Sequence, residues 1–133
     1  MSVTFRGRAL IDGEARGEVL RCTSEIPGWG GVDPKTGAIV EKGHPQFGQS
    51  MAGRILVIPG AKGASGWSGQ FHIAKLNGMA PLAVITESIN TKLALGLTVL
   101  GVPALIDLPD AALTALQTGR TAAIAGNVLT VEE

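Results

Sequence analysis

The residues best suited to chemistry lie in one stretch, IPGAKGASGWSGQF, residues 58–71. It holds four glycines, two serines (Ser65 and Ser68) and one lysine (Lys62), between a run that predicts a strand and one that predicts a helix. The first N–H groups of a helix have no partners, and the helix dipole leaves them partly positive. Because small residues let a carboxylate or phosphate approach these groups closely, and Lys62 adds a charge, the stretch favours an anionic ligand.

Three interpretations of this glycine-rich loop stay open on motif shape alone. In the first, it only connects a strand to a helix, and its serines cap the helix. In the second, it binds a dinucleotide, with Glu87 as the ribose-binding acid, although the glycine spacing is G-x-x-G-x-x-G rather than G-x-G-x-x-G. In the third, it is an anion cradle that carries a reactive serine. A P-loop is excluded because no Gly-Lys-Ser/Thr triplet occurs.

Other candidate residues have plainer explanations. We interpret His44 as a surface histidine that stabilises its loop and His72 as a partly exposed helix residue, and the two do not make a metal site. Asp33 is expected to cap its own turn. Cys22, the only cysteine, excludes an internal disulfide and is interpreted as a half-buried strand thiol rather than a nucleophile. Trp29 has two equally plausible roles: it covers the core of this domain, or it anchors a partner protein.

Composition and charge limit the function classes. With 133 residues and 45% apolar content, residues 1–133 are expected to form one globular domain. The eleven basic and eleven acidic side chains cancel, which argues against partners such as nucleic acid or a membrane surface. No apolar run approaches the roughly 18 residues of a membrane span, and the charged N-terminus does not resemble a signal peptide. We therefore expect a cytoplasmic protein.

The elements that must position the loop are mainly strands in the first half of the chain. In the second half, strands alternate with helices. The unbroken apolar runs at 54–59 and 81–86 predict strands covered on both faces. Residues 3–11 and 17–22 predict a hairpin or meander, followed by a long, ordered loop over 23–45. The other predicted elements are helices over 68–78, 90–101 and 108–119, a strand over 103–107, and two strands around the turn Gly126–Asn127.

This order of elements predicts an α/β fold. Short parallel-type strands are joined by helices, and both ends of the chain contribute further strands. We expect two sheet layers with helices packed on one side.

The motifs together resemble one known family. The segment WGGVDPKTGAI, followed by HPQFGQSMAGRILVIPGAKGASGWSG, is similar to the small, swivelling subunit of the aconitase X family. The most specific pieces are GGVDP.TG.I, the HP..G step and a strand leading into a G-[KR]-G-x-S loop. The resemblance covers residues 3–131 and implies a swivelling β/β/α domain similar to the C-terminal domain of aconitase.

The resemblance also implies a hydro-lyase (dehydratase) subunit that is active only with a larger catalytic subunit. In such enzymes the iron–sulfur cluster or iron is held by cysteines of the large subunit, and this chain would bind none alone. Ser65 matches the serine base that takes a C–H proton from the hydroxy acid, and Ser68 is a rival base. The matching positions for substrate binding are Lys62, Gly63, Ala64, Gly66 and Trp67.

One difference between this loop and the loop of many family members indicates the substrate. Archaeal members of the family are phosphomevalonate dehydratases, and many bacterial members convert cis-3-hydroxy-L-proline to pyrroline-2-carboxylate. Many archaeal relatives carry two adjacent serines where this chain has Ala64–Ser65. The lost hydroxyl and Trp67 indicate a less polar pocket, so we expect the hydroxyproline, with phosphomevalonate as the alternative. A noncatalytic module that binds a small anion and regulates or scaffolds a partner is the alternative from another class.

Overall fold

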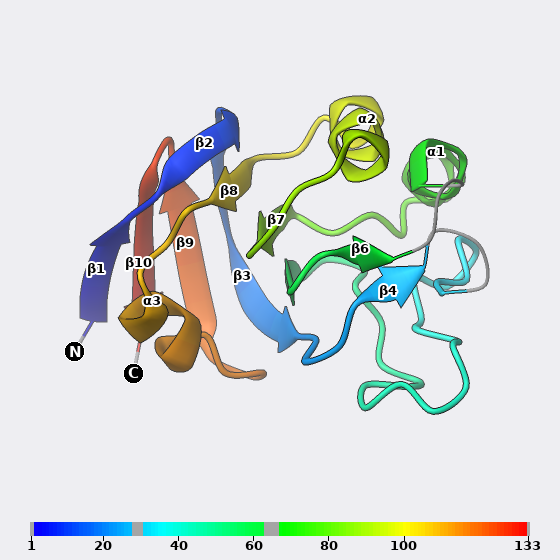
Figure 1. The fold of residues 1–133 in the computed structure, drawn as a ribbon, viewed down its shortest axis with the longest axis horizontal. Coiled ribbons are helices and arrows are strands. Elements are labelled where there is room, and N and C mark those ends of the chain that lie inside the picture. The colour runs from blue at the N-terminus through cyan, green and yellow to red at the C-terminus, as the bar shows by residue number, and fades with distance from the viewer. Residues whose placement is uncertain (1, 28–30, 63–66, 133) are drawn as a thin grey trace.

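The structure, a computed structural model, describes residues 2–27, 31–62 and 67–132 as an α/β fold in which helices cover a sheet (Figure 1). The elements are β1 (Ser2–Arg6), β2 (Arg8–Ile11), β3 (Glu14–Arg21), β4 (Ile26–Pro27), β5 (Ile55–Ile58), β6 (Ala61–Lys62), α1 (Trp67–Leu76), β7 (Ala83–Thr86), α2 (Thr91–Leu100), β8 (Ala104–Ile106), α3 (Asp110–Ala115), β9 (Thr121–Ala125) and β10 (Val128–Glu132).

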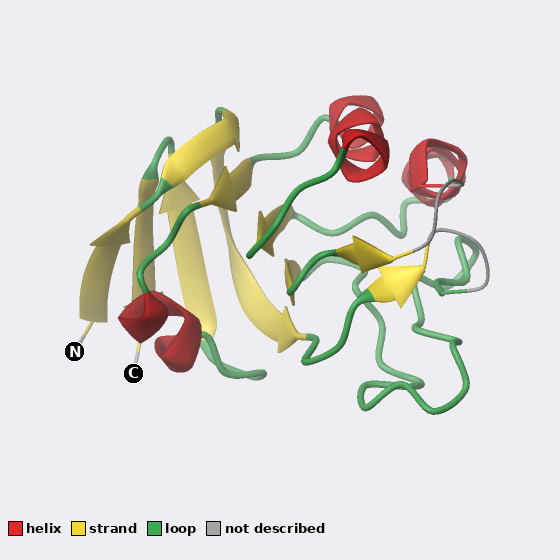
Figure 2. Ribbon diagram, viewed as in Figure 1, coloured by secondary structure: helices red, strands yellow, loops and turns green. Residues whose placement is uncertain are grey.

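The main sheet closes on itself through the N-terminal strand. Its strand order is β1-β10-β9-β3-β5-β7-β8-β2. β1 and β2 stand at opposite ends of this order, yet only Gly7 separates them in the chain (Figure 2). One bent strand therefore pairs antiparallel with β10 before Gly7 and with β8 after it. Closure of this kind protects sheet edges that would otherwise be open to pairing with another chain.

Gly7 is the corner of this bent strand. Its N–H donates to the carbonyl oxygen of Asn127 at 2.9 Å. A Cβ at this position would lie 2.8 Å from the carbonyl oxygen of Ile106 and 2.9 Å from Cδ2 of Leu108. Because the first of these atoms belongs to the backbone of β8, it cannot rotate away. Only glycine fits where the two halves of the sheet meet.

The central strands β3, β5, β7 and β8 run parallel to one another. Every residue of β5 and β7 is buried, which confirms the two strands that the apolar runs predicted. β3 changes partner along its length: residues 14–18 pair antiparallel with β9, and residues 19–21 pair parallel with β5. β3 therefore joins the antiparallel half of the sheet to the parallel half.

Alternate residues of the parallel strands serve two separate cores. Leu56 and Ile58 belong to a buried cluster that also contains residues of α1 and α2. Ile55 and Val57 belong to a second cluster, shared with β9, β10 and α3. The layers are sheet, sheet and helix, with α1 and α2 side by side over the parallel strands (Figure 1). The predicted two sheet layers are confirmed, whereas α3 packs on the sheet–sheet core rather than beside α1 and α2.

The ends of α2 follow from its capping residues. Asn90 Oδ1 accepts a hydrogen bond from the N–H of Leu93 at 2.8 Å, and Gly101 ends the helix with a left-handed φ of 72°. These caps confirm the predicted start and end of this helix. The predicted turn at Gly126–Asn127 is confirmed as well, since it joins the antiparallel pair β9 and β10. None of the described helices has the length and apolar character needed to cross a membrane.

The pairing of the N-terminal strands differs from the prediction. β1 and β3 do not form a hairpin or meander with each other, because β1 pairs with β10 and β3 pairs with β9. Hydrophobic alternation identifies a strand, but it does not identify the strand's partner.

The long loop and the third helix also differ in detail. The described part of the loop over 23–45 contains β4 and a bridge between Val32 and Ile39, both buried, so it is ordered as predicted. The predicted helix over 108–119 is shorter: α3 begins after Pro109 and ends before Leu116. Leu116 has a ψ of 71°, outside the helical range, so the chain leaves the helix there.

Substitution of Gly7 tests the closure of the sheet. We expect Gly7→Ala to lower the free energy of unfolding by about 1–3 kcal/mol, because the new Cβ overpacks the corner. Gly69→Ala is the matched control, since a Cβ at Gly69 in α1 meets no heavy atom within 4 Å. The control should raise the free energy of unfolding by about 0.5–1 kcal/mol through helix propensity. Urea unfolding followed by circular dichroism measures both, and equal midpoints for Gly7→Ala and the wild type would contradict the role of Gly7.

Candidate functional site

The carboxyl ends of the parallel strands meet at one edge of the sheet. Because β3, β5, β7 and β8 run in one direction, the segments that follow them leave from that edge. In α/β folds, open or closed, ligands bind preferentially outside the carboxyl ends of the parallel strands. The glycine-rich loop follows β5, so the fold positions it where a binding site is expected.

β4 and β6 extend this edge beyond the main sheet. Ile26 pairs with Ala61 and Pro27 with Lys62 in a parallel, two-stranded sheet. The chain leaves β6 and returns as α1, which begins at Trp67 (Figure 1). The described segments on either side of residues 63–66 are therefore a short strand pair and a helix.

The structure positions the predicted site residues at the two ends of this loop. Lys62 is the last residue of β6, Trp67 is the first residue of α1, and Ser68 follows it in the helix. Four predicted site residues lie outside the described residues: Gly63, Ala64, Ser65 and Gly66.

No acidic side chain occupies the positive end of the α1 dipole, a feature that α1 shares with α2. Its first turn, Trp67 to Gln70, carries no acidic side chain, and its last turn carries Lys75. An acidic residue in the first turn would occupy the positive end of the helix dipole. Its absence leaves that end available to a negatively charged group from outside the helix.

Three residues that the sequence analysis did not single out meet beside the loop: Glu25, Gly60 and Ser88. A Cβ at Gly60 would collide with Ser88 Oγ and would lie 3.1 Å from Glu25 Oε2. The Ser88 hydroxyl donates to the carbonyl oxygen of Pro59 at 2.9 Å, and the Thr86 hydroxyl donates to the carbonyl oxygen of Ser88 at 2.6 Å. These bonds hold the turn after β7 against the end of β5.

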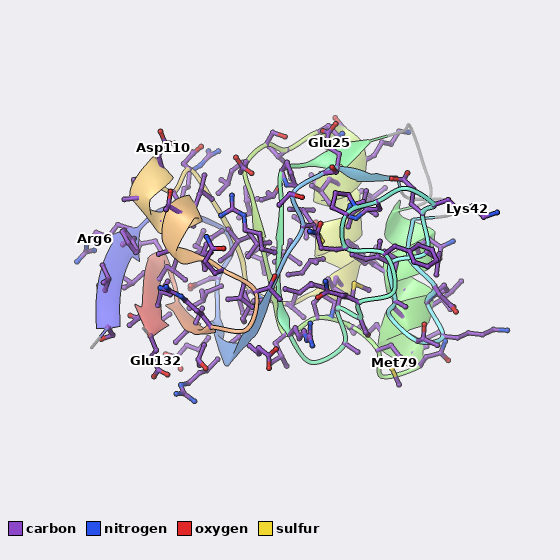
Figure 3. The ribbon with its side chains drawn as sticks, turned by 90° about the horizontal axis from the view of Figure 1, so that it is seen from below. Arg6, Glu25, Lys42, Met79, Asp110 and Glu132 are labelled. Atoms are coloured by element: carbon purple, nitrogen blue, oxygen red, sulfur yellow. The ribbon has the colours of Figure 1, made fainter. Side chains whose placement is uncertain are left out.

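Glu25 places a carboxylate at the rim of this edge. Its side chain is exposed, and it lies at the upper rim of the molecule in Figure 3. No motif spacing links Glu25, Gly60 and Ser88 in the sequence. The one signal that could have linked them is that each follows a strand of the parallel set, namely β3, β5 or β7.

His44 fastens the long loop to the chain after β3. Its Nε2 lies 3.1 Å from the carbonyl oxygen of Ser24, and its Nδ1 accepts from the N–H of Gln46 at 3.0 Å. This pair of partners assigns the proton of the neutral ring to Nε2. The predicted loop-stabilising role therefore agrees with the structure. The predicted surface position is wrong, because the residue is only 5% exposed.

The turn after Val32 ties the same loop to the residue that follows α1. Asp33 Oδ1 accepts from the N–H of Lys35 at 2.9 Å, so Asp33 caps its own turn as predicted. Asn77 Nδ2 donates to the carbonyl oxygen of Pro34 at 3.2 Å. Trp29, the other residue that the sequence analysis considered in this loop, lies outside the described residues.

Gln70 is a buried polar residue in the first turn of α1. It is 8% exposed, and its Oε1 has no hydrogen-bond partner within the described part of the chain. A buried acceptor without a donor is costly. One turn behind the glycine-rich loop, Gln70 therefore offers an acceptor to a donor outside the described residues.

Cys22 is unsuited to chemistry. It is 1% exposed rather than half-buried, and burial raises the pKa of its thiol from 9.0 to about 12. A thiol in this state is neither nucleophilic nor a ready metal ligand. The described residues contain no group of three or more His, Cys, Asp or Glu side chains that could hold a metal ion. The described part of this chain therefore does not fit an iron–sulfur cluster.

The fold and the site agree with one protein family. Residues 4–132 match the family described as the aconitase X swivel domain. The crystal structure of the holo-form of aconitase X from Thermococcus kodakaraensis superposes with a TM-score of 0.91 at 30% identity, covering 98% of this chain and 99% of that chain. The chain belongs to the aconitase X family as its swivelling domain, which confirms the family and fold class expected from the sequence.

Two relatives indicate the class of enzyme to which this family member is similar. The phosphomevalonate dehydratase small subunit of Methanocella arvoryzae is 32% identical over 128 residues, which are 96% of this chain and 97% of that protein. The cis-3-hydroxy-L-proline dehydratase of Pseudomonas aeruginosa is 37% identical over 89 residues, which are 67% of this chain and 15% of that protein. Both names agree with the expected class, a dehydratase subunit or domain, but they differ in substrate.

Substitution of Gly60 tests whether the edge beside the loop must stay open. We expect Gly60→Ala to change the stability little, because both neighbouring atoms are ends of side chains that can rotate. It should nevertheless displace Ser88 and Glu25 and lower anion binding by the chain. Ser88→Ala combined with Gly60→Ala removes the colliding hydroxyl and should restore part of the binding. Calorimetric titration with a carboxylate measures this, and wild-type binding by Gly60→Ala alone would contradict a role for the open edge.

The Cys22 thiol predicts a specific pH dependence. The folded protein holds the thiol proton more tightly than the unfolded chain, so this contribution to stability is complete below about pH 9 and is lost as the pH rises toward about 12. In Cys22→Val, where nothing titrates at this position, the loss of stability in that window should be smaller. Guanidinium unfolding on both sides of pH 9 measures the difference. At neutral pH, a thiol reagent should label the native wild type only as fast as the protein opens, and rapid labelling would contradict the burial.

Proposed function

We propose that residues 1–133 act as one swivelling domain, the small subunit of a cytoplasmic, heteromeric dehydratase. The observation that carries the proposal is the strand–loop–helix connection at the carboxyl edge of the parallel strands, in a chain of the aconitase X family. The partner would be a large catalytic subunit, which the name of the Methanocella relative supports. The Pseudomonas relative is consistent with this, since the matched region is a small part of a longer chain.

In this proposal Ser65 is the base of the reaction. Dehydration next to a carboxylate requires removal of a weakly acidic C–H proton while a hydroxyl group leaves. The Ser65 alkoxide would take the proton. A serine anion needs stabilisation, and the N–H groups of Gly66 and Trp67, the positive start of α1 and the charge of Lys62 would provide it.

The substrate anion would bind to the same loop. Backbone N–H groups from Gly63 and Ala64 onward, with Lys62 at the end of β6, would supply donors suited to a carboxylate. The absence of an acidic side chain in the first turn of α1 supports this role. Loss of the hydroxyl group is assigned to the large subunit, where the resemblance puts the iron–sulfur cluster or iron.

Two substrates are supported by different observations. The single serine of Ala64–Ser65, together with Trp67, favours cis-3-hydroxy-L-proline, because a less polar loop has fewer donors for a phosphate. The Methanocella relative, which matches this chain over nearly its whole length, favours phosphomevalonate. We propose the hydroxyproline first and phosphomevalonate second.

Replacement of Ser65 in the reconstituted pair of subunits tests the function. Ser65→Ala should lower kcat about 10²–10⁴-fold, because proton transfer by a positioned base contributes about that much. KM should change little. Assembly with the large subunit, measured by gel filtration, should also be unchanged. Ser68→Ala is the matched control and should keep turnover close to that of the wild type. Full turnover by Ser65→Ala would contradict the assignment of Ser65 as the base. Loss of turnover only in Ser68→Ala would identify Ser68 as the base instead.

The same complex distinguishes the substrates. Cis-3-hydroxy-L-proline and phosphomevalonate are assayed side by side, and we expect the larger kcat/KM with the hydroxyproline. The reverse order would assign the complex to phosphomevalonate. A pair that turns over neither compound, while the chain still binds small anions, would favour a noncatalytic regulatory or scaffolding module.

A further inference from the structure

A second polar site opens at the end of β3. It is an open hollow of about 510 Å³, and four of its six described lining residues, Thr23, Thr114, Gln117 and Thr118, are exposed. It lies between the end of β3, the loop that His44 fastens, and α3 with the turn that follows. The described residues that line it are Arg21, Thr23, Gln46, Thr114, Gln117 and Thr118.

This pocket lies on the opposite face of the parallel sheet from α1. Successive residues of a strand point to opposite faces. Leu20 and Cys22 pack in the core that contains residues of α1 and α2, whereas Val19 packs in the core shared with α3. Arg21 alternates with Leu20 and therefore points toward α3, where its guanidinium donates to the carbonyl oxygen of Leu113. The Arg21 pocket is thus separated from the start of α1 by the sheet.

The hydrogen bonds of the wall leave donors facing the pocket. Gln46 Oε1 already accepts from the N–H of Thr23 at 2.9 Å. Thr118 Oγ1 accepts from the N–H of Arg21 at 2.9 Å, so its own hydroxyl hydrogen is still available to donate. A guanidinium has five N–H donors, and the contact with Leu113 uses only part of this capacity. Gln46 Nε2 already donates to Thr23 Oγ1 at 3.4 Å, and Gln117 Nε2 to the carbonyl oxygen of Thr114 at 2.7 Å. The donors left for a ligand are the Thr118 hydroxyl and the remaining guanidinium N–H groups.

The charge of the wall is positive and uncompensated. None of the six described lining residues is acidic. The ion pairs found among the described residues involve Arg8, Arg16 and Arg54, and none involves Arg21. Arg21 is also fixed in place by Leu113, so less side-chain entropy is lost when a ligand binds. A positioned guanidinium with hydroxyl donors around it complements a multi-oxygen anion.

We propose that the Arg21 pocket binds a small anion through a phosphate or carboxylate group. The guanidinium of Arg21 makes the charged contact, and the hydroxyl of Thr118 donates to a second oxygen. Binding here goes beyond the dehydratase function and does not require Ser65 to act as a base.

Titration of the 133-residue chain, monitored by two-dimensional ¹H–¹⁵N NMR, tests the Arg21 pocket. Inorganic phosphate and succinate are added in separate arms at constant ionic strength. We expect saturable shifts at Thr118 and at the Arg21 side-chain N–H with at least one of the anions, and the anion that saturates identifies the group recognised. Arg21→Gln should weaken binding about tenfold or more, since a charge-assisted contact is lost. Arg120→Gln, which removes an exposed arginine on the turn after α3, is the matched control and should leave binding unchanged.

A second variant covers the case in which Arg21→Gln disturbs the fold. Thr118→Val removes the hydroxyl that would donate to the second oxygen and leaves the Arg21 side chain in place, and it should weaken binding about threefold. Shifts that never saturate with either anion would overturn the proposal, as would equal affinities for Arg21→Gln and Arg120→Gln. A Ser65→Ala chain that still binds the anion at the Arg21 pocket, whatever its turnover, separates this site from the proposed catalytic loop.

Discussion

The parallel pairing of β3, β5, β7 and β8 is the constraint on which the rest of the structure depends. β5 and β7 are buried on both faces, and burial of each large aliphatic side chain contributes roughly 1.5–3 kcal/mol. Parallel strands require a crossover between each pair, so every segment after a strand leaves from the same edge. Glu25, Gly60 and Ser88, far apart in the sequence, meet there for that reason.

Features that depend on local sequence could be predicted. The apolar runs identify β5 and β7, Asn90 and Gly101 identify the ends of α2, and Gly126–Asn127 identifies the turn between β9 and β10. The partners of β1 and β3 could not be predicted, because side-chain alternation is the same whichever strand lies alongside. The length of α3 was overestimated because the prediction placed the helix stop at Gly119, whereas the backbone already leaves the helix at Leu116.

The candidate site was predictable only where one short segment carries it. The loop from Lys62 to Trp67 stands out by its glycines and its place between a strand and a helix, and the structure puts its two ends at β6 and α1. Glu25 and Ser88 carry no such signal, because their relation arises from strand order alone. Burial of His44 was missed for a similar reason: its partner, the carbonyl oxygen of Ser24, belongs to a segment 20 residues away.

Two glycines show how differently the two halves of the domain are built. At Gly7 the missing side chain lets backbone of β1–β2 pack against β8, and the sheet closes with its own apolar core. At Gly60 the missing side chain leaves room for the polar ends of Ser88 and Glu25. In the first turn of α1, Gln70 keeps a buried acceptor without a donor in the described chain. Buried polar groups are rarely left unpaired, yet the described residues supply no partner for Gln70 Oε1 or for Arg54 Nη1, just before β5. The two glycines therefore serve different ends: Gly7 allows backbone to pack closely where the sheet closes, and Gly60 leaves room for polar side chains beside the strand ends.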